Sequence, residues 1–304
     1  MSKMKVTILG CGSALPTEKH FNSSQVLNIG EKLFMIDCGE GAQIRLRQLK
    51  IKTSKLNHIF ISHLHGDHCF GLIGFISTLG MLGRKENLYI YAHADLEKIL
   101  QPQIDYFCQE MPYRVIFNHI NPRANEVIFE DRTIRVTTIP LKHAIPTCGF
   151  LFEEKEKERH LIREKINFFK VPVRQLHLLK KGADFVCPDG KIIPNSQLTK
   201  AGEPAKKYAY CSDTAYFEKV IPIIQGADCL FHEATFTEKE TIRAKETFHS
   251  TAKQAAEIAL KAQVKKLLIG HYSARYRNYE TILAEAKSVF EDTFATEDGN
   301  IFEI

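Results

Sequence analysis

Three histidines and one aspartate fall within six consecutive positions, directly after a short apolar run. The segment Ser62–His68 reads SHLHGDH. Because successive strand residues point to opposite faces, His63 and His65 lie on one side at a strand end and can bind one metal ion. Asp67 and His68 follow, at the expected start of a helix, where they face a second ion. The segment therefore predicts a binuclear metal site.

Two metal ions that also bind water need more ligands than this segment provides. His143, Asp213 and His271 each follow an apolar run, as residues at strand ends do. The expected ligands are His63, His65 and His143 for one ion, Asp67, His68 and His271 for the other, and Asp213 between them. Two cations acidify a water between them, which provides a nucleophile for hydrolysis. These donor types favour two zinc ions and leave manganese or iron open.

Strands and helices are expected in both halves of the chain. The expected strands are Lys5–Leu9, Gln25–Ile29, Lys32–Ile36, Asn57–Ser62, Leu88–Ala92, Val115–Ile120, Glu126–Phe129, Thr133–Ile139, Lys207–Cys211, Ala227–Phe231 and Lys266–Ile269. The expected helices are Phe70–Gly80, Asp95–Phe107, Thr251–Ala262 and Tyr279–Phe290, with Ser250 as the N-cap of the third. This mixture predicts an α/β fold, a four-layer sandwich of two stacked sheets with helices outside.

One stretch differs in character from the rest. Residues 153–207 are dense in Lys, Arg and Glu and contain several proline and glycine turn signals. We interpret them as an arm inserted into a single domain that spans residues 1–304.

Charge and cysteine content constrain partners and location. The net charge of +5 permits a phosphate-rich partner without requiring one. The eight cysteines show no C-x-x-C spacing, which favours reduced thiols over a disulfide scaffold or a zinc ribbon. The sequence shows no signal-peptide core and no apolar stretch long enough to cross a bilayer. We therefore expect a cytoplasmic protein with no membrane partner.

Five short motifs, in order along the chain, resemble those of the ribonuclease Z family in the metallo-β-lactamase superfamily. They are Asp37–Gln43 (DCGEGAQ), Cys211–Thr214 (CSDT), His232–Thr235 (HEAT), His249–Thr251 (HST) and Gly270–Tyr276 (GHYSARY). The resemblance extends from Thr7 to about Asn278. It implies the metallo-β-lactamase αββα sandwich with an inserted flexible arm, and a zinc endoribonuclease that removes 3′ trailers from precursor tRNA.

The resemblance also implies roles for single residues. His249 would act as the general acid at the leaving group, Glu233 would orient it, and Asp67 would accept the proton of the attacking water. Arg275 would bind a substrate phosphate, although a surface ion pair explains this residue equally well. Family members also suggest a homodimer in which each arm reaches a tRNA at the partner's active site.

Two departures from the family pattern leave alternatives open. The family's P-x-K-x-R-N element is Pro16–Asn22 here, with no arginine before Asn22. The arm tip, Lys170–His177, keeps only Pro172 of the usual glycine- and proline-rich element. Two interpretations of the arm therefore stay open, a solvated charged helix and an RNA-binding element. A small-molecule phosphodiesterase or arylsulfatase-like hydrolase is the second interpretation, and a non-catalytic RNA-binding scaffold is the third.

Overall fold

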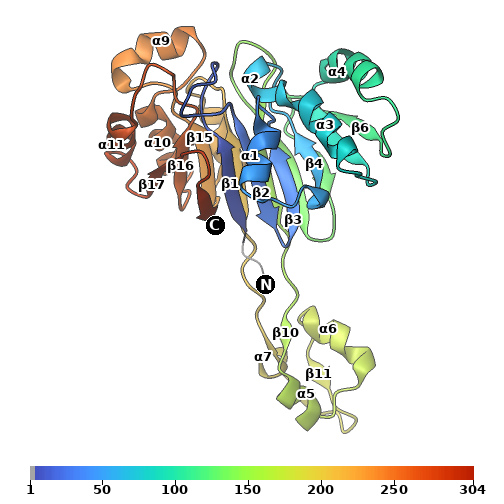
Figure 1. The fold of residues 1–304 in the computed structure, drawn as a ribbon. Helices are drawn as coiled ribbons and strands as arrows, with labels where there is room; N and C mark the ends of the chain where they lie inside the picture. Colours follow the sequence, from blue (N-terminus) through green and yellow to red (C-terminus); the bar gives the residue numbers. More distant parts are fainter. Residues whose placement is uncertain (1–3) are drawn as a thin grey trace. The chain divides into compact units, whose positions relative to one another are not determined.

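The computed structural model describes residues 4–304, which form two compact units (Figure 1). The first unit contains residues 4–130, 136–152 and 206–304, and the second contains residues 131–135 and 153–205. In residues 4–304, no helix combines the length and apolar character needed to span a membrane.

The first unit contains two seven-stranded sheets. The first sheet, in spatial order, is β18 (Ile301–Glu303), β1 (Lys5–Gly10), β2 (Ser24–Ile29), β3 (Lys32–Ile36), β4 (Leu56–Phe60), β5 (Leu88–Ala92) and β6 (Val115–His119). The second is β17 (Thr293–Ala295), β16 (Leu267–Gly270), β15 (Cys229–Glu233), β14 (Lys207–Cys211), β9 (Cys148–Glu154), β8 (Ile134–Pro140) and β7 (Val127–Glu130). From β3 to β6 and from β14 to β17 the strands run parallel, so their carboxyl ends share one edge.

Aromatic side chains fill the space between the two sheets. Phe34 of β3 and Phe152 of β9 have ring centroids 5.9 Å apart, and Phe60 of β4 lies 5.5 Å from Phe150 of β9. All four rings are fully buried. These contacts join the inner faces of the sheets, as in other stacked-sheet proteins.

Helices cover the outer face of each sheet (Figure 1). On the first sheet they are α1 (Ala42–Gln48), α2 (Gly66–Cys69), α3 (Gly71–Met81) and α4 (Asp95–Phe107). On the second they are α10 (Ala252–Lys261) and α11 (Glu280–Lys287), and the shorter helices α8 (Ile221–Ile224) and α9 (Thr241–Glu246) lie in the connections that precede them. An apolar cluster that includes Leu46, Phe75 and Leu100 anchors α1, α3 and α4. The predicted four-layer αββα sandwich is confirmed.

Some local expectations were wrong. Thr251, not Ser250, is the N-cap of α10. Its hydroxyl accepts from the backbone N–H of Gln254, and the Gln254 side chain accepts from the backbone N–H of Thr251, which completes a capping box. Ser250 is instead buried and donates its hydroxyl to the Thr214 carbonyl at 2.6 Å. Asp67 and His68 lie on the separate one-turn helix α2 rather than on the helix that follows.

The second unit has a small core of its own. Its elements are β10 (His160–Leu161), α5 (Arg163–Phe168), α6 (Leu176–Lys180), β11 (Phe185–Val186), β12 (Ile192–Ile193), α7 (Asn195–Leu198) and β13 (Thr199–Lys200). The buried residues are Ile166, Val171, Leu179, Phe185, Ile193 and Leu198. Asn195 ties them together, because its side-chain amide donates to the carbonyls of Leu179 and Ala183 at 2.8 and 2.7 Å.

Candidate active site

The candidate ligands follow the carboxyl ends of strands from both sheets. Ser62–His68 comes after β4, His143 after β8, Asp213 after β14 and His271 after β16. Asp213 and His271 have φ values of 57° and 61°. Left-handed backbone is unfavourable for residues other than glycine, and it is retained where the surrounding structure fixes it, often at functional sites. The strand ends bring all seven predicted ligands together.

Four of these residues form the first group, in which donor atoms converge. His65 Nδ1 lies 3.0 Å from His63 Nε2 and 3.2 Å from His143 Nε2. Asp213 Oδ2 lies 3.5 Å from His63 Nε2 and 3.7 Å from His143 Nε2. Three imidazole nitrogens and one carboxylate oxygen suit a tetrahedral zinc ion.

Asp67, His68 and His271 form the second group, and Asp213 faces both groups. Asp67 Oδ2 lies 3.6 Å from His68 Nε2 and 3.7 Å from His271 Nε2. Asp213 Oδ1 lies 3.1 and 3.2 Å from the same two nitrogens. One oxygen of Asp213 therefore points to each group, which is the geometry of a bridging carboxylate.

Two buried nitrogen atoms indicate that these residues fit metal ions. His68 Nε2 and His271 Nε2 are buried, yet neither makes a hydrogen bond. Buried polar atoms in proteins nearly always have a partner, so such atoms call for an ion or a ligand. Imidazole and carboxylate donors suit a metal cofactor.

Asp37 orients two of the imidazoles. His68 Nδ1 donates to Asp37 Oδ2 at 2.7 Å. The Ser62 hydroxyl donates to the same oxygen at 2.9 Å and is 3.0 Å from His63 Nδ1, from which it accepts. Tyr210 also donates its hydroxyl to Asp37 Oδ2, at 2.7 Å. One fully buried carboxylate thus holds one ring directly and a second ring through a hydroxyl.

Glu233 orients two further imidazoles, those of His249 and His271. Glu233 Oε1 lies 2.8 Å from His249 Nδ1. The Thr235 hydroxyl donates to Glu233 Oε2 and accepts from His271 Nδ1 at 2.9 Å. Burial disfavours a charge on His249, but the Glu233 carboxylate outweighs it and raises the pKa of His249 to about 9.

These contacts select the tautomer of each ring. His63, His68 and His271 all have Nδ1 engaged by a carboxylate or a hydroxyl, and His143 Nδ1 donates to the Phe248 carbonyl at 3.0 Å. In each of the four rings the Nε2 lone pair is left to face the group of ligands. Outer partners of this kind usually fix the orientation of metal-binding histidines.

The charges of the site favour a cation. Burial lowers the pKa of His63 and His143, which keeps both imidazoles neutral and able to bind metal. Burial opposes ionisation of Asp213, but His271 and His68 hold its pKa well below the ordinary value. Burial likewise opposes charge on His68, but Asp213 and Asp37 raise its pKa well above the ordinary value. A metal ion at this position would neutralise the same carboxylates and leave His68 a neutral ligand.

Arg275 has its own partner outside both groups. Its Nη1 pairs with Glu240 Oε1 at 2.8 Å, and its guanidinium lies over the Phe236 ring at 5.2 Å from the centroid. In this structure Arg275 therefore makes the ion pair that was one of its two expected roles.

Sequence reasoning assigned no role to Asp37, Ser62 or Thr235. Asp37 directly follows the apolar strand β3, which is the signal that identified His143, Asp213 and His271. Its φ of 57° repeats the left-handed backbone of Asp213 and His271. Asp37 therefore shares the strand-end position of the candidate ligands.

Comparison with known proteins places this site in a family. A family model described as anti-Pycsar protein Apyc1 matches residues 4–162, and one described as a beta-lactamase superfamily domain matches residues 198–272. Ribonuclease Z of Phocaeicola vulgatus is 58% identical over 293 residues, covering 96% of this chain and 95% of that protein. Ribonuclease Z of Parabacteroides distasonis is 56% identical over 299 residues, 98% of each. The crystal structure of human tRNase Z, short form, aligns with a TM-score of 0.72 and 23% identity over 99% of both chains, which shows a shared fold. Since the identity to the two bacterial proteins extends over nearly the whole sequence, the chain belongs to the ribonuclease Z family of the metallo-β-lactamase superfamily.

Proposed function

We propose that this protein is a zinc-dependent endoribonuclease that removes 3′ trailers from precursor tRNA. It hydrolyses a phosphodiester bond and leaves a 3′ hydroxyl on the tRNA. The observation that carries the proposal is the 58% identity to a ribonuclease Z over 96% of the chain. The convergence of seven candidate ligands supports the hydrolytic chemistry.

The proposed cofactor is two zinc ions per subunit, in the groups described above. His63, His65 and His143 would hold one ion, Asp67, His68 and His271 the other, and Asp213 both. The ions would supply positive charge that polarises the phosphodiester and acidifies water. Five of the seven ligands are imidazoles, which suit zinc and iron, and two are carboxylates, which also suit manganese, so metal analysis of the purified protein decides among the three.

Asp67 and His249 are the proposed proton-transfer residues. Asp67 Oδ2 accepts from the backbone N–H of Ala14 at 2.8 Å, which fixes the carboxylate so that it can take a proton from water. The ring centroid of His249 lies 5.1 Å from that of His143 and 5.3 Å from that of His271, so it borders both ligand groups. With a pKa of about 9, His249 carries a proton at neutral pH that it can give to the leaving oxygen. Glu233 would hold that imidazole in place.

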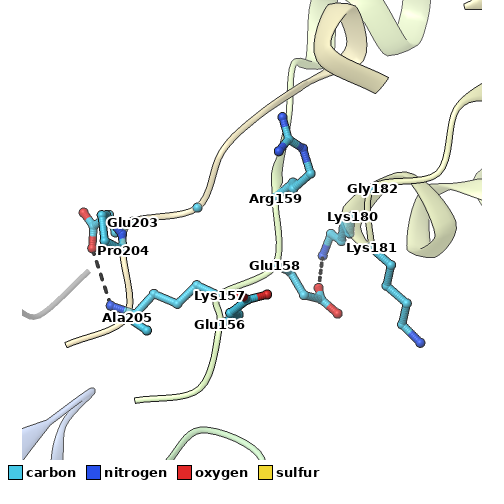
Figure 2. A pocket seen from close by; sticks show the side chains of 11 residues that line it. Glu156, Lys157, Glu158, Arg159, Lys180, Lys181, Gly182, Glu203, Pro204 and Ala205 are labelled. Atoms are coloured by element: carbon cyan, nitrogen blue, oxygen red, sulfur yellow. Dashed lines mark ion pairs between the residues drawn. The ribbon is translucent and has the colours of Figure 1, made fainter. Parts of the chain in front are cut away.

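The second unit is the proposed tRNA-binding arm. Figure 2 shows a pocket in this unit lined by Lys157, Arg159, Lys180 and Lys181 together with Glu156, Glu158 and Glu203. Lys157 pairs with the buried Glu154 at 3.1 Å and lies 3.7 Å from Glu203, while Lys180 pairs with Glu158 at 3.5 Å. A phosphate backbone would compete with the exposed Glu158 for Lys180, since surface pairs of this kind are weak enough to exchange. We also retain Arg275 as a phosphate-binding residue that would leave Glu240 when RNA binds.

The proposal extends to assembly and location. A homodimer is supported by exposed apolar side chains on the adjoining helices α3 and α4 and at the end of α3, namely Met81, Leu82, Ile99, Tyr106 and Phe107. A cytoplasmic location is supported by eight unpaired cysteines, as in proteins of a reducing compartment. Sedimentation analysis tests the dimer, and a Tyr106→Lys variant should shift it to monomer.

A cleavage assay tests the activity. The zinc-loaded protein is incubated with a precursor tRNA that carries a 3′ trailer, in parallel with Asp67→Ala and with the surface control Asp95→Ala. One cut at the trailer junction by wild type and control, absent with Asp67→Ala, is the expected result. Hydrolysis of bis(p-nitrophenyl) phosphate without any tRNA cut would favour the small-molecule phosphodiesterase instead. Full tRNA cleavage after metal removal would contradict the metal-dependent mechanism.

A further inference from the structure

A second cluster of metal-binding residue types lies outside the active-site groups. Cys11 follows β1, His20 precedes β2, and Asp298 lies in the turn between β17 and β18. Cys11 Sγ lies 3.4 Å from His20 Nδ1 and 3.3 Å from Asp298 Oδ1, and the last two atoms are 3.3 Å apart. The three donor atoms therefore form a nearly equilateral triangle.

The size of this triangle matches a coordination sphere. A point equidistant from three atoms 3.3–3.4 Å apart lies about 2 Å from each, and zinc bonds to nitrogen, oxygen and sulfur are about 2.0–2.3 Å long. Hydrogen bonds between a charged carboxylate and an imidazole are normally shorter, about 2.7–2.9 Å. The contacts are thus long for hydrogen bonds and right for ligands that surround a cation.

Three neighbouring donors converge on one oxygen of Asp298. Asp298 Oδ1 lies within reach of three donors: the Cys11 backbone N–H at 3.2 Å, the Cys11 thiol at 3.3 Å and His20 Nδ1 at 3.3 Å. Asp298 Oδ2 accepts from the backbone N–H of Phe21 at 2.8 Å. The thiol has one alternative acceptor, the Thr296 carbonyl at 3.4 Å. His20 Nδ1 is the ring nitrogen that faces both the acid and the thiol, and Nε2 points away from the cluster without a partner.

We propose that Cys11 Sγ, His20 Nδ1 and Asp298 Oδ1 form a further divalent-metal site, separate from the active-site groups and suited to zinc. A thiolate, an imidazole and a carboxylate are all common zinc ligands. Thiolate and carboxylate together carry two negative charges, which one divalent ion neutralises. His20 and Asp298 line a surface pocket, from which water can reach a fourth coordination position.

The position of the site implies a structural role. Cys11 and Asp298 are 287 positions apart, so the ion would tie the first strand to the chain's last turn. Cross-links that close long loops restrict the unfolded chain most. Cys11 also precedes the loop in which the Ala14 backbone N–H contacts Asp67 Oδ2 at 2.8 Å. The ion would therefore brace a loop that orients a residue of the active site.

Cobalt titration of the metal-free full-length protein tests this site. The active-site groups consist of histidine and aspartate, so only a thiolate site gives a sulfur-to-cobalt charge-transfer band in the near ultraviolet. We expect three cobalt equivalents per chain, with the band appearing as one of them binds. Saturation at two equivalents without this band would overturn the proposal and leave a hydrogen-bonded cluster only.

Matched variants locate the ligand. Cys11→Ser should lose the band and one of the three equivalents, while Cys108→Ser, a buried cysteine at the end of α4, should keep both. His20→Gln should weaken cobalt binding at the same site at least tenfold, which covers the case in which Cys11→Ser does not fold. A band that persists in folded Cys11→Ser would show that another thiolate binds the metal, contrary to the proposal.

Discussion

Glu233 Oε1 lies 2.8 Å from His249 Nδ1, at the border of the two ligand groups. The same carboxylate accepts from the backbone N–H groups of Thr214 at 2.8 Å and Ser250 at 3.1 Å, so it is held on three sides. A fixed anion next to an imidazole stabilises the imidazolium and aligns it. The pair is therefore built to present a proton rather than to remove one.

The first prediction concerns the pH dependence of cleavage by Glu233→Gln. His249 has a raised pKa, so its proton is present below that pKa and is lost as pH rises through about 9. A neutral amide removes the charge that raises the pKa. We expect the alkaline limb of the kcat profile to move to lower pH, and kcat at neutral pH to fall by about 10–100-fold, the usual cost of losing such a partner.

The control for this experiment is Glu238→Gln, an exposed glutamate close in the sequence that pairs with Lys253. Its profile should match wild type. An alkaline limb that stays in place in Glu233→Gln would mean that His249 is not the titrating acid.

The second prediction concerns Asp37 and metal affinity. Asp37→Asn leaves His68 Nδ1 and the Ser62 hydroxyl without their carboxylate acceptor. We expect zinc affinity, measured by chelator competition, to fall by about 10–100-fold while the circular dichroism spectrum is unchanged.

Two neighbouring tyrosines of β14 provide a matched pair for this measurement. Tyr210 donates its hydroxyl to Asp37, whereas Tyr208 donates to Gln25, and both are fully buried. Tyr210→Phe should weaken zinc binding by up to about tenfold, and Tyr208→Phe should leave it unchanged. Equal effects would show that metal affinity reports general stability rather than the Asp37 contact.

The sequence alone could group the candidate metal ligands because they are local or follow apolar strands. His63 to His68 form one continuous segment, and the parallel strands β4, β14 and β16 end at the same edges as their neighbours. Ligand type and strand position therefore sufficed to group residues as distant as His63 and His271.

Features that depend on side-chain geometry could not be predicted in this way. Asp37 follows an apolar strand, but its orienting role depends on the four donor groups that surround its carboxylate in the fold. Strand β9 was missed because it runs directly into the charged stretch that begins at Glu153. The cap at Thr251 depends on which of two adjacent hydroxyls points along the helix, and Ser250 points to Thr214 instead.

The third prediction tests whether the second unit is needed for tRNA cleavage but not for the hydrolytic step itself. Asn195→Ala removes the amide that bonds Leu179 and Ala183, and it also deprives the Thr199 hydroxyl of an acceptor at 2.6 Å. Leaving such buried groups unpaired costs about 1–3 kcal/mol each, which should loosen this small core. We expect slower cleavage of precursor tRNA and unchanged hydrolysis of bis(p-nitrophenyl) phosphate.

Gln197→Ala, an exposed change on the same short helix α7, is the control and should affect neither substrate. If Asn195→Ala increases protease sensitivity of residues 153–205 without slowing tRNA cleavage, the proposed tRNA-binding role of the arm is wrong.

The fourth prediction concerns the capping box of α10. Thr251→Ala removes an oxygen that accepts from the Gln254 backbone N–H, and such N-cap losses cost about 0.5–2 kcal/mol. For a chain of this size the melting temperature should fall by roughly 2–4 °C per kcal/mol, measured by calorimetry on the zinc-loaded protein. Lys253→Ala, within the same helix, should change it by less than about 1 °C. Because Thr251 lies two residues after His249, we also expect kcat to fall in Thr251→Ala. An unchanged melting temperature would mean that Gln254 finds another partner and that the cap does not stabilise this helix.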